Sequence, residues 1–144
     1  EYVSLDELFA LSDGLGLQKP LFPFNTGIIN RENIAKMKDG VIIINTGRGQ
    51  LIRTSDLIEG LKEKKIGAAG LDVYKEEADY FNQDSSDRIM GDDMLARLLS
   101  FNNVILTSHQ GFFTREALDN IARTTLENIQ AFSHGECLNE VKYK

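Results

Sequence analysis

The chain has 144 residues, 42% hydrophobic content and a formal charge of −6. This length suits one domain with a hydrophobic core and is short for two. The basic residues are scattered and form no cluster, which argues against a nucleic-acid partner. The single Cys137 excludes an internal disulfide, and no apolar stretch resembles a signal or a membrane span. These features predict a cytoplasmic protein with neither a membrane nor a nucleic acid as partner.

Strand and helix patterns alternate along the chain. The predicted elements are, in order, helix 5–11 capped by Ser4, strand 14–17, helix 31–37 capped by Asn30, strand 41–46, a helix opened by Thr54 or Ser55, strand 67–71, helix 93–100, strand 103–107 and helix 115–132 capped by Thr114. This alternation predicts an α/β fold with a partial Rossmann-like, doubly wound parallel sheet and flanking helices. The continuously apolar run 41–44 is typical of a strand buried on both faces. The acidic stretch 75–91 predicts a long surface excursion.

Three of the apolar runs lead into a side chain that is suited to chemistry. Residues 41–47 lead to Arg48, residues 67–71 to Asp72 and residues 104–108 to His109. Because parallel strands end at one edge of the sheet, where open α/β sheets bind ligands, these three side chains should converge. Glu77, just after Asp72, adds a second carboxylate. The set would provide an anion-binding group, a base and a residue that orients the base.

Each of these residues also has a structural interpretation. His109 can be an ordinary polar residue at a strand end, and Asp72 can cap a turn. Arg48 can be a solvated loop residue, although the glycines on both sides would let the backbone approach a ligand closely. Glu77 lies in an acidic run, which is typical of a solvated surface. The combination of the four, more than any one residue, favours a functional site.

Several other kinds of site are not supported. The pairs Gly47-Arg48-Gly49 and Gly14-Leu15-Gly16 both lack the third glycine of a dinucleotide-binding loop. One cysteine and two distant histidines do not make a metal site, so no metal is predicted. The Gly-x-Ser-x-Gly pattern of serine hydrolases does not occur. The sequence therefore lacks the motifs of a phosphate cradle, a zinc site and a serine nucleophile.

Three motifs together resemble the D-isomer-specific 2-hydroxyacid dehydrogenases, and within them the fermentative D-lactate dehydrogenase branch. They are Asn45-Thr46-Gly47-Arg48-Gly49, then Gly70-Leu71-Asp72-Val73-Tyr74 with Glu77 five residues past Asp72, and finally Ser108-His109-Gln110-Gly111-Phe112-Phe113. The resemblance runs from residue 1 to about residue 141 and covers well under half of a complete family member. It implies that residues 1–133 are the C-terminal part of a nucleotide-binding domain. Residues 134–144 would return toward the substrate domain.

The resemblance implies an NAD-dependent oxidoreductase that interconverts pyruvate and D-lactate. Arg48 would bind the substrate carboxylate and polarise the keto oxygen. His109 would give a proton to that oxygen or remove it in the reverse direction, while Glu77 would hydrogen-bond His109 and fix its orientation. The partner is a small 2-keto or 2-hydroxy acid, and the full-length protein would be a homo-oligomer.

Further residues follow from the same resemblance. Asp72 would hold the nicotinamide end of NAD. The implied cofactor contacts are Thr46, Gly47, Asp72 and Gln18, and the implied substrate-pocket residues are Phe112 and Phe113. Gln18 stands where family members carry histidine, and Phe22 and Phe24 would be exposed on a loop. The phosphate loop and the substrate domain of the family would precede Glu1, so the 144 residues alone are expected to be inactive.

Three alternative functions stay open. The first is a dehydrogenase of the same family that acts on a larger or phosphorylated acid, although two phenylalanines after His109 favour a small substrate. The second is a NAD-sensing interaction module like the co-repressor branch of the family, although the acidic stretch is more similar to the lactate branch. The third is a degenerate copy whose remaining role is contact within an oligomer.

Overall fold

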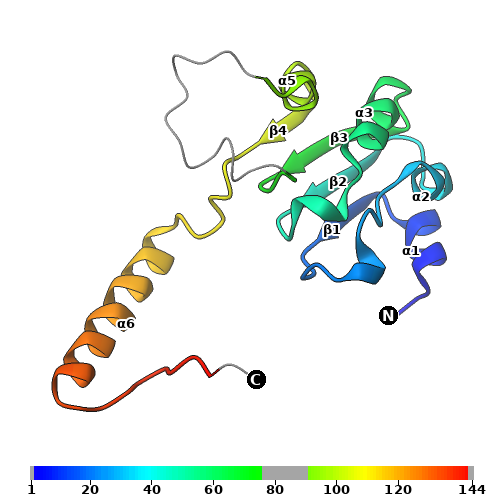
Figure 1. Ribbon diagram of the computed structural model, residues 1–144. Helices are drawn as coiled ribbons and strands as arrows, with labels where there is room; N and C mark the ends of the chain where they lie inside the picture. The colour runs from blue at the N-terminus through cyan, green and yellow to red at the C-terminus, as the bar shows by residue number, and fades with distance from the viewer. Residues whose placement is uncertain (1, 76–90, 143–144) are drawn as a thin grey trace. The chain divides into compact units, whose positions relative to one another are not determined.

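The computed structural model describes residues 2–75 and 91–142 (Figure 1). The chain divides into two compact units, Glu1–His109 and Gln110–Lys144. The predicted acidic excursion, apart from its two ends, lies outside the described residues.

The first unit contains a parallel sheet with the strand order β1-β2-β3-β4. Within the described residues its strands are β1 (Gly14–Leu17), β2 (Val41–Asn45), β3 (Ile66–Leu71) and β4 (Val104–Leu106). Leu17 is in register with Asn45, Asn45 with Leu71, and Leu71 with Leu106. The carboxyl ends of all four strands therefore lie in one row. This confirms the predicted parallel α/β sheet.

The helices of this unit begin close to the predicted residues. They are α1 (Leu5–Leu11), α2 (Arg31–Lys36), α3 (Thr54–Lys62) and α5 (Asp93–Leu99). Ser4 and Asn30 cap α1 and α2 through their side chains, as predicted. By contrast, α3 begins without a side-chain cap. The cap of α5 is Asp92, which the sequence patterns did not identify.

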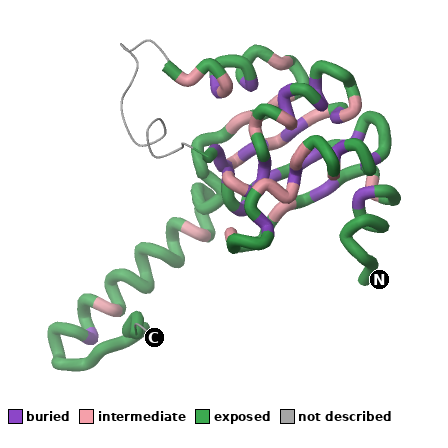
Figure 2. Tube along the Cα trace, turned by 45° about the vertical axis from the view of Figure 1, so that its right-hand side comes forward, coloured by how far each residue is buried: buried purple, intermediate pink, exposed green. Residues whose placement is uncertain are grey.

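One hydrophobic core lies between these helices and one face of the sheet. The four helices contribute Phe9, Ile34, Leu57 and Leu98, among others. In β2, Val41 and Ile43 are buried in this core, whereas Ile42 and Ile44 are 46% and 49% exposed. The prediction that both faces of strand 41–44 are covered is therefore wrong for this chain. The reason is that α1, α2, α3 and α5 all contribute buried side chains to the single core that contains Val41 and Ile43. Figure 2 shows buried residues in both the strands and the helices of this unit.

The alternation in β2 provides a test of this core. Replacing Ile43, which is 0% exposed, with alanine is expected to lower the free energy of unfolding by about 3 kcal/mol, because apolar contacts are lost and a cavity remains. The neighbouring Ile42→Ala change is the matched control, with an expected loss below about 1 kcal/mol. Urea denaturation of the 144-residue chain measures both. Equal losses would show that the second face of β2 is buried as well.

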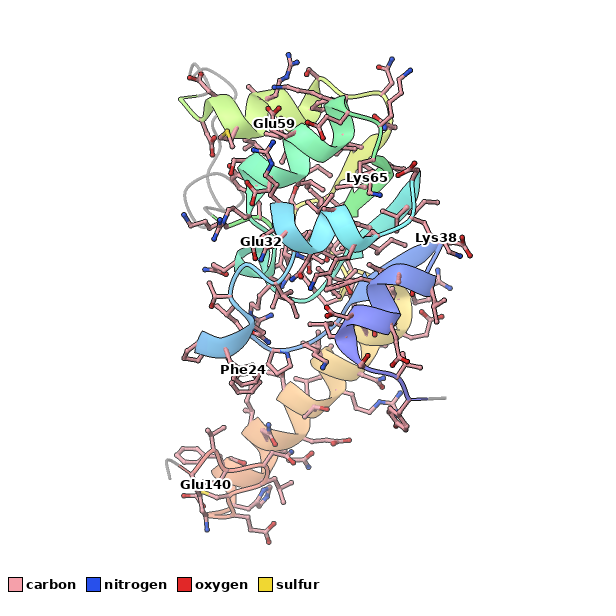
Figure 3. The ribbon with its side chains drawn as sticks, turned by 90° about the vertical axis from the view of Figure 1, so that its right-hand side faces the viewer. Phe24, Glu32, Lys38, Glu59, Lys65 and Glu140 are labelled. Atoms are coloured by element: carbon pink, nitrogen blue, oxygen red, sulfur yellow. The ribbon has the colours of Figure 1, made fainter. Side chains whose placement is uncertain are left out.

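The loop after β1 carries two stacked phenylalanines. Phe22 and Phe24 are exposed, as predicted, and their ring centroids lie 5.3 Å apart with an interplanar angle of 7°. Phe24 belongs to the short 3-10 helix Pro23–Asn25 and is labelled in Figure 3. The Asn25 side chain accepts a hydrogen bond from the Phe22 N–H (2.7 Å) and donates one to the Pro20 carbonyl (2.9 Å). These bonds fix the loop that presents the two rings.

The second unit consists of α6 (Arg115–Ser133) and the segments beside it. The Thr114 side chain accepts a hydrogen bond from the Ala117 N–H, which confirms the predicted cap. His134 caps the carboxyl end of the helix and is followed by Gly135, which has a φ of +82°. Within the part of the chain that the structure describes, no helix combines the length and the apolar character needed to cross a membrane.

Candidate active site

Arg48 lies in a tight turn that directly follows β2. Asn45, the last residue of that strand, is fully buried, and its side chain makes two hydrogen bonds across the turn. Its Oδ1 accepts from the Gly47 N–H (3.1 Å), and its Nδ2 donates to the Arg48 carbonyl (3.0 Å). The Arg48 side chain is exposed, and its Nη1 donates to the Gly47 carbonyl (2.8 Å). The turn therefore presents a guanidinium at the carboxyl edge of the sheet on a scaffold fixed by Asn45.

The glycines on either side of Arg48 allow close contacts inside the protein. A Cβ atom on Gly47 would lie 2.9 Å from the Lys19 carbonyl oxygen. A Cβ atom on Gly49 would lie 2.2 Å from the Tyr74 carbonyl carbon. The sequence pattern suggested that these glycines let the backbone approach a ligand, whereas in the structure they let it approach neighbouring loops. The Arg48 turn is thus packed between the segments that follow β1 and β3.

Asp72 connects the ends of three adjacent strands. Its N–H donates to the Asn45 carbonyl (2.9 Å), and its own carbonyl accepts from the His109 N–H (2.7 Å). The Thr107 hydroxyl donates to the Asp72 carboxylate. The carboxylate is therefore held at the edge of the sheet, between the Arg48 turn and the segment that carries His109.

His109 lies just beyond β4, with an exposed side chain and a φ of +54°. This left-handed conformation is uncommon for residues other than glycine, and such strain often occurs at functional sites. The backbone bond to Asp72 holds the residue in this conformation. The structure thus places Arg48, Asp72 and His109 after adjacent strand ends at one edge, as the sequence predicted.

Two further polar residues extend this row. Gln18 directly follows β1, and Thr46 directly follows β2. Both are exposed, and the Thr46 N–H donates to the Leu17 carbonyl (3.1 Å). We define Gln18, Thr46, Arg48, Asp72 and His109 as the strand-end row.

Four residues of the predicted site are not part of this row. Gly47 lies within the Arg48 turn, where its N–H donates to Asn45. Glu77 lies outside the described residues, so its contact with His109 stays a prediction. Phe112 and Phe113 belong to the second unit, where their exposed rings contact each other edge to face with centroids 6.2 Å apart. Their role in a substrate pocket also stays a prediction.

Asn45 and Thr107 also support the site, although neither was predicted to have a role in it. For Asn45 the signal is an asparagine two residues before a Gly-x-Gly segment, because asparagine side chains bond to the backbone of turns. For Thr107 the sequence offers no comparable signal, since its partner Asp72 is 35 residues away.

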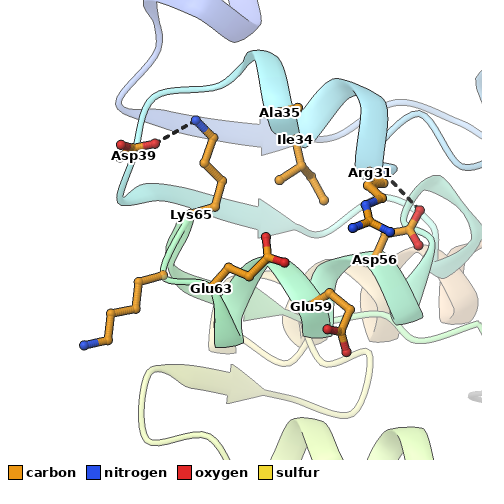
Figure 4. Close-up of a pocket in the computed structure, with 10 residues that line it drawn as sticks. Arg31, Ile34, Ala35, Asp39, Asp56, Glu59, Glu63 and Lys65 are labelled. Atoms are coloured by element: carbon orange, nitrogen blue, oxygen red, sulfur yellow. Dashed lines mark hydrogen bonds and ion pairs between the residues drawn. The ribbon is translucent and has the colours of Figure 1, made fainter.

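A hollow lies between α2 and α3, on the helix layer (Figure 4). The Lys65 ammonium pairs with Asp39 (2.7 Å), and the Asp56 carboxylate accepts from the Arg31 N–H (2.9 Å). No described residue of the predicted site lines this hollow. Because no described residue of the predicted site lines this hollow, and Lys65 and Asp56 already have partners there, the strand-end row is the better candidate for an active site.

Polar side chains that follow the carboxyl ends of a parallel sheet are the arrangement of nucleotide-binding α/β domains. The family model for the NAD binding domain of D-isomer specific 2-hydroxyacid dehydrogenases matches residues 1–111. The chain therefore belongs to the D-isomer specific 2-hydroxyacid dehydrogenase family, which confirms the resemblance seen in the sequence.

Known members of the family are similar to the chain over nearly its whole length. It is 50% identical over 141 residues to an aromatic 2-oxoacid reductase of Clostridium sporogenes, covering 97% of the chain and 43% of the relative. It is 46% identical over 142 residues to a D-lactate dehydrogenase of Escherichia coli, covering 98% of the chain and 43% of the relative. The crystal structure of a D-lactate dehydrogenase with NAD+ from Lactobacillus jensenii matches with a TM-score of 0.88 at 32% identity. The match covers 99% of the chain and 43% of the dehydrogenase. The chain thus spans about 43% of the length of these relatives.

Three residues of the strand-end row carry polar groups of the kind that a carboxamide requires. Gln18, Thr46 and Asp72 offer an amide, a hydroxyl and a carboxylate, which can complement the donor and acceptor atoms of a carboxamide. They follow three adjacent strands at the edge where α/β sheets bind nucleotides. The chemistry of this edge therefore agrees with the NAD-binding family to which the chain belongs.

Proposed function

We propose that the full-length protein containing this chain is an NAD-dependent dehydrogenase whose substrate pair is pyruvate and D-lactate. The observation that carries the proposal is the strand-end row, which holds a guanidinium, a carboxylate and an imidazole after adjacent parallel strands. The D-lactate dehydrogenases among the relatives support this substrate pair.

In this proposal Arg48 and His109 act directly on the substrate. The planar guanidinium of Arg48 binds the carboxylate of the 2-oxo acid with paired, charge-assisted hydrogen bonds. His109 gives a proton to the keto oxygen during reduction and takes it from the hydroxyl in the reverse direction. Glu77 accepts a hydrogen bond from His109 and orients it. NAD, when bound, supplies the hydride chemistry.

The remaining predicted residues bind the cofactor and enclose the substrate. The nicotinamide end of the cofactor is held by Thr46, Gly47, Asp72 and Gln18. Phe112 or Phe113 forms a wall of the pocket around the substrate side chain. Residues 1–133 act as the C-terminal part of the nucleotide-binding domain, and residues 134–144 lead back toward the substrate domain.

Substrate preference tests the proposal against its main alternative. A 50% identical relative is an aromatic 2-oxoacid reductase, which favours an aromatic acid as a second candidate substrate. Two phenylalanines close to His109 in the sequence favour a small substrate, so we expect kcat/KM with NADH to be roughly tenfold higher for pyruvate than for phenylpyruvate. Kinetics of the full-length protein measure this ratio. A preference for phenylpyruvate would show that the protein acts on aromatic 2-oxo acids. If neither acid supported oxidation of NADH, the dehydrogenase proposal would be refuted.

A further inference from the structure

A hydrogen bond between Tyr74 and Asp92 has no part in the function proposed above. Tyr74 follows β3 by three residues and is 5% exposed, and Asp92 directly precedes α5. The Tyr74 hydroxyl donates to Asp92 Oδ2 (2.6 Å). The other carboxylate oxygen, Oδ1, accepts from the N–H groups of Met94 (2.9 Å) and Leu95 (3.0 Å). One carboxylate therefore caps α5 and also holds the Tyr74 side chain.

The ionised form of Asp92 suits both contacts. Burial raises the pKa of Asp92, but the hydrogen bonds from Tyr74, Leu95 and Met94 outweigh it and bring the pKa below the ordinary value of 3.8. The group is therefore charged at neutral pH. Hydrogen bonds to a charged acceptor are stronger than those between neutral groups, so the Tyr74 side chain is firmly held.

The backbone of Tyr74 forms one side of the packing around the Arg48 turn. A Cβ atom on Gly49 would lie 2.2 Å from the Tyr74 carbonyl carbon and 2.4 Å from the Lys75 nitrogen. Gly49 is buried and follows Arg48 directly. Because backbone touches backbone here, a displacement of Tyr74 changes the space that is open to the Arg48 turn.

We propose that Tyr74 and Asp92 are positioning residues for Arg48. Their hydrogen bond fixes the Tyr74 backbone, and this backbone supports Gly49 and thereby the guanidinium of the preceding residue. The inference rests on the proposed function, in which Arg48 binds the substrate carboxylate. Tyr74 and Asp92 act through the turn and not on the reacting atoms.

Two variants of the full-length protein remove the bond from opposite sides. Tyr74→Phe keeps the ring and loses the hydroxyl, and Asp92→Ser keeps a capping oxygen for α5 and loses the acceptor for Tyr74. Each is expected to raise KM for the 2-oxo acid about tenfold and to leave KM for NADH within about twofold of wild type. The double variant should be no worse than either single variant, because both changes break the same bond. Additive effects, or a parallel rise in KM for NADH, would overturn the proposal.

Hydrogen exchange gives a readout that does not depend on turnover. The Leu51 N–H donates to the Arg48 carbonyl (3.1 Å), so exchange of this amide reports on the turn. Tyr74→Phe is expected to accelerate it about tenfold, whereas Ser4→Ala, which removes the cap of α1, should leave it unchanged. Unchanged exchange in Tyr74→Phe would refute the positioning role. A wild-type protein that reduces no 2-oxo acid would instead refute the proposed function, whatever the exchange result.

Discussion

Replacing His109 with asparagine is expected to lower kcat/KM of the full-length protein for its 2-oxo acid about a thousandfold, because the positioned proton donor is lost. Asparagine is the suitable replacement because His109 has a φ of +54°. Among residues with side chains, asparagine tolerates this left-handed conformation well. The backbone bond to Asp72 should therefore persist, and the loss should report on the imidazole.

The other histidine of the chain provides the matched control. His134 caps the carboxyl end of α6, and its Nδ1 lies 2.8 Å from the Gln130 carbonyl oxygen. His134→Asn should keep kcat/KM within about twofold of wild type, since His134 is exposed and the proposed mechanism gives it no part. Steady-state oxidation of NADH measures both variants, and circular dichroism verifies their folding. If His109→Asn kept activity within about tenfold of wild type, the acid–base role would be wrong.

Replacing Gly49 with alanine is expected to lower the free energy of unfolding by about 3 kcal/mol, the upper range for overpacking. The added Cβ atom would lie 2.2 Å from the Tyr74 carbonyl carbon, a distance that real contacts do not reach. The obstacle is backbone, which cannot rotate away as a flexible side chain can. The Arg48 turn and the segment after β3 must therefore separate.

Gly16 in β1 is the matched control for this change. A Cβ atom there would have no heavy atom within 4 Å. Gly16→Ala is expected to be neutral or to stabilise the chain by less than about 1 kcal/mol, because it restricts the unfolded chain. Urea unfolding compares the two variants. Equal stability would mean that the turn does not need its contact with Tyr74.

Local chemistry explains why much of the fold follows from the sequence. Ser4, Asn30 and Thr114 cap the helices that they were predicted to begin, since a cap depends only on residues two or three positions away. The strand-end row is equally predictable. Parallel strands share one direction, so residues that directly follow them gather at one edge whatever the details of packing.

Features that depend on distant segments were not predictable. The apolar run 41–44 is compatible with one covered face or two, because apolar side chains do not identify what packs against them. The Tyr74–Asp92 bond joins residues 18 positions apart, and no sequence period relates them. The need for glycine at position 49 likewise depends on where the backbone after β3 runs.

The open face of the sheet affects how the stability of this chain changes with temperature. Ile42, Ile44 and Ile105 are exposed in the native state. The heat capacity increment of unfolding comes largely from apolar surface that water reaches only after unfolding, so these side chains add little to it. The 144-residue chain should therefore have a smaller increment, and a flatter stability curve, than a domain of equal length with both sheet faces covered.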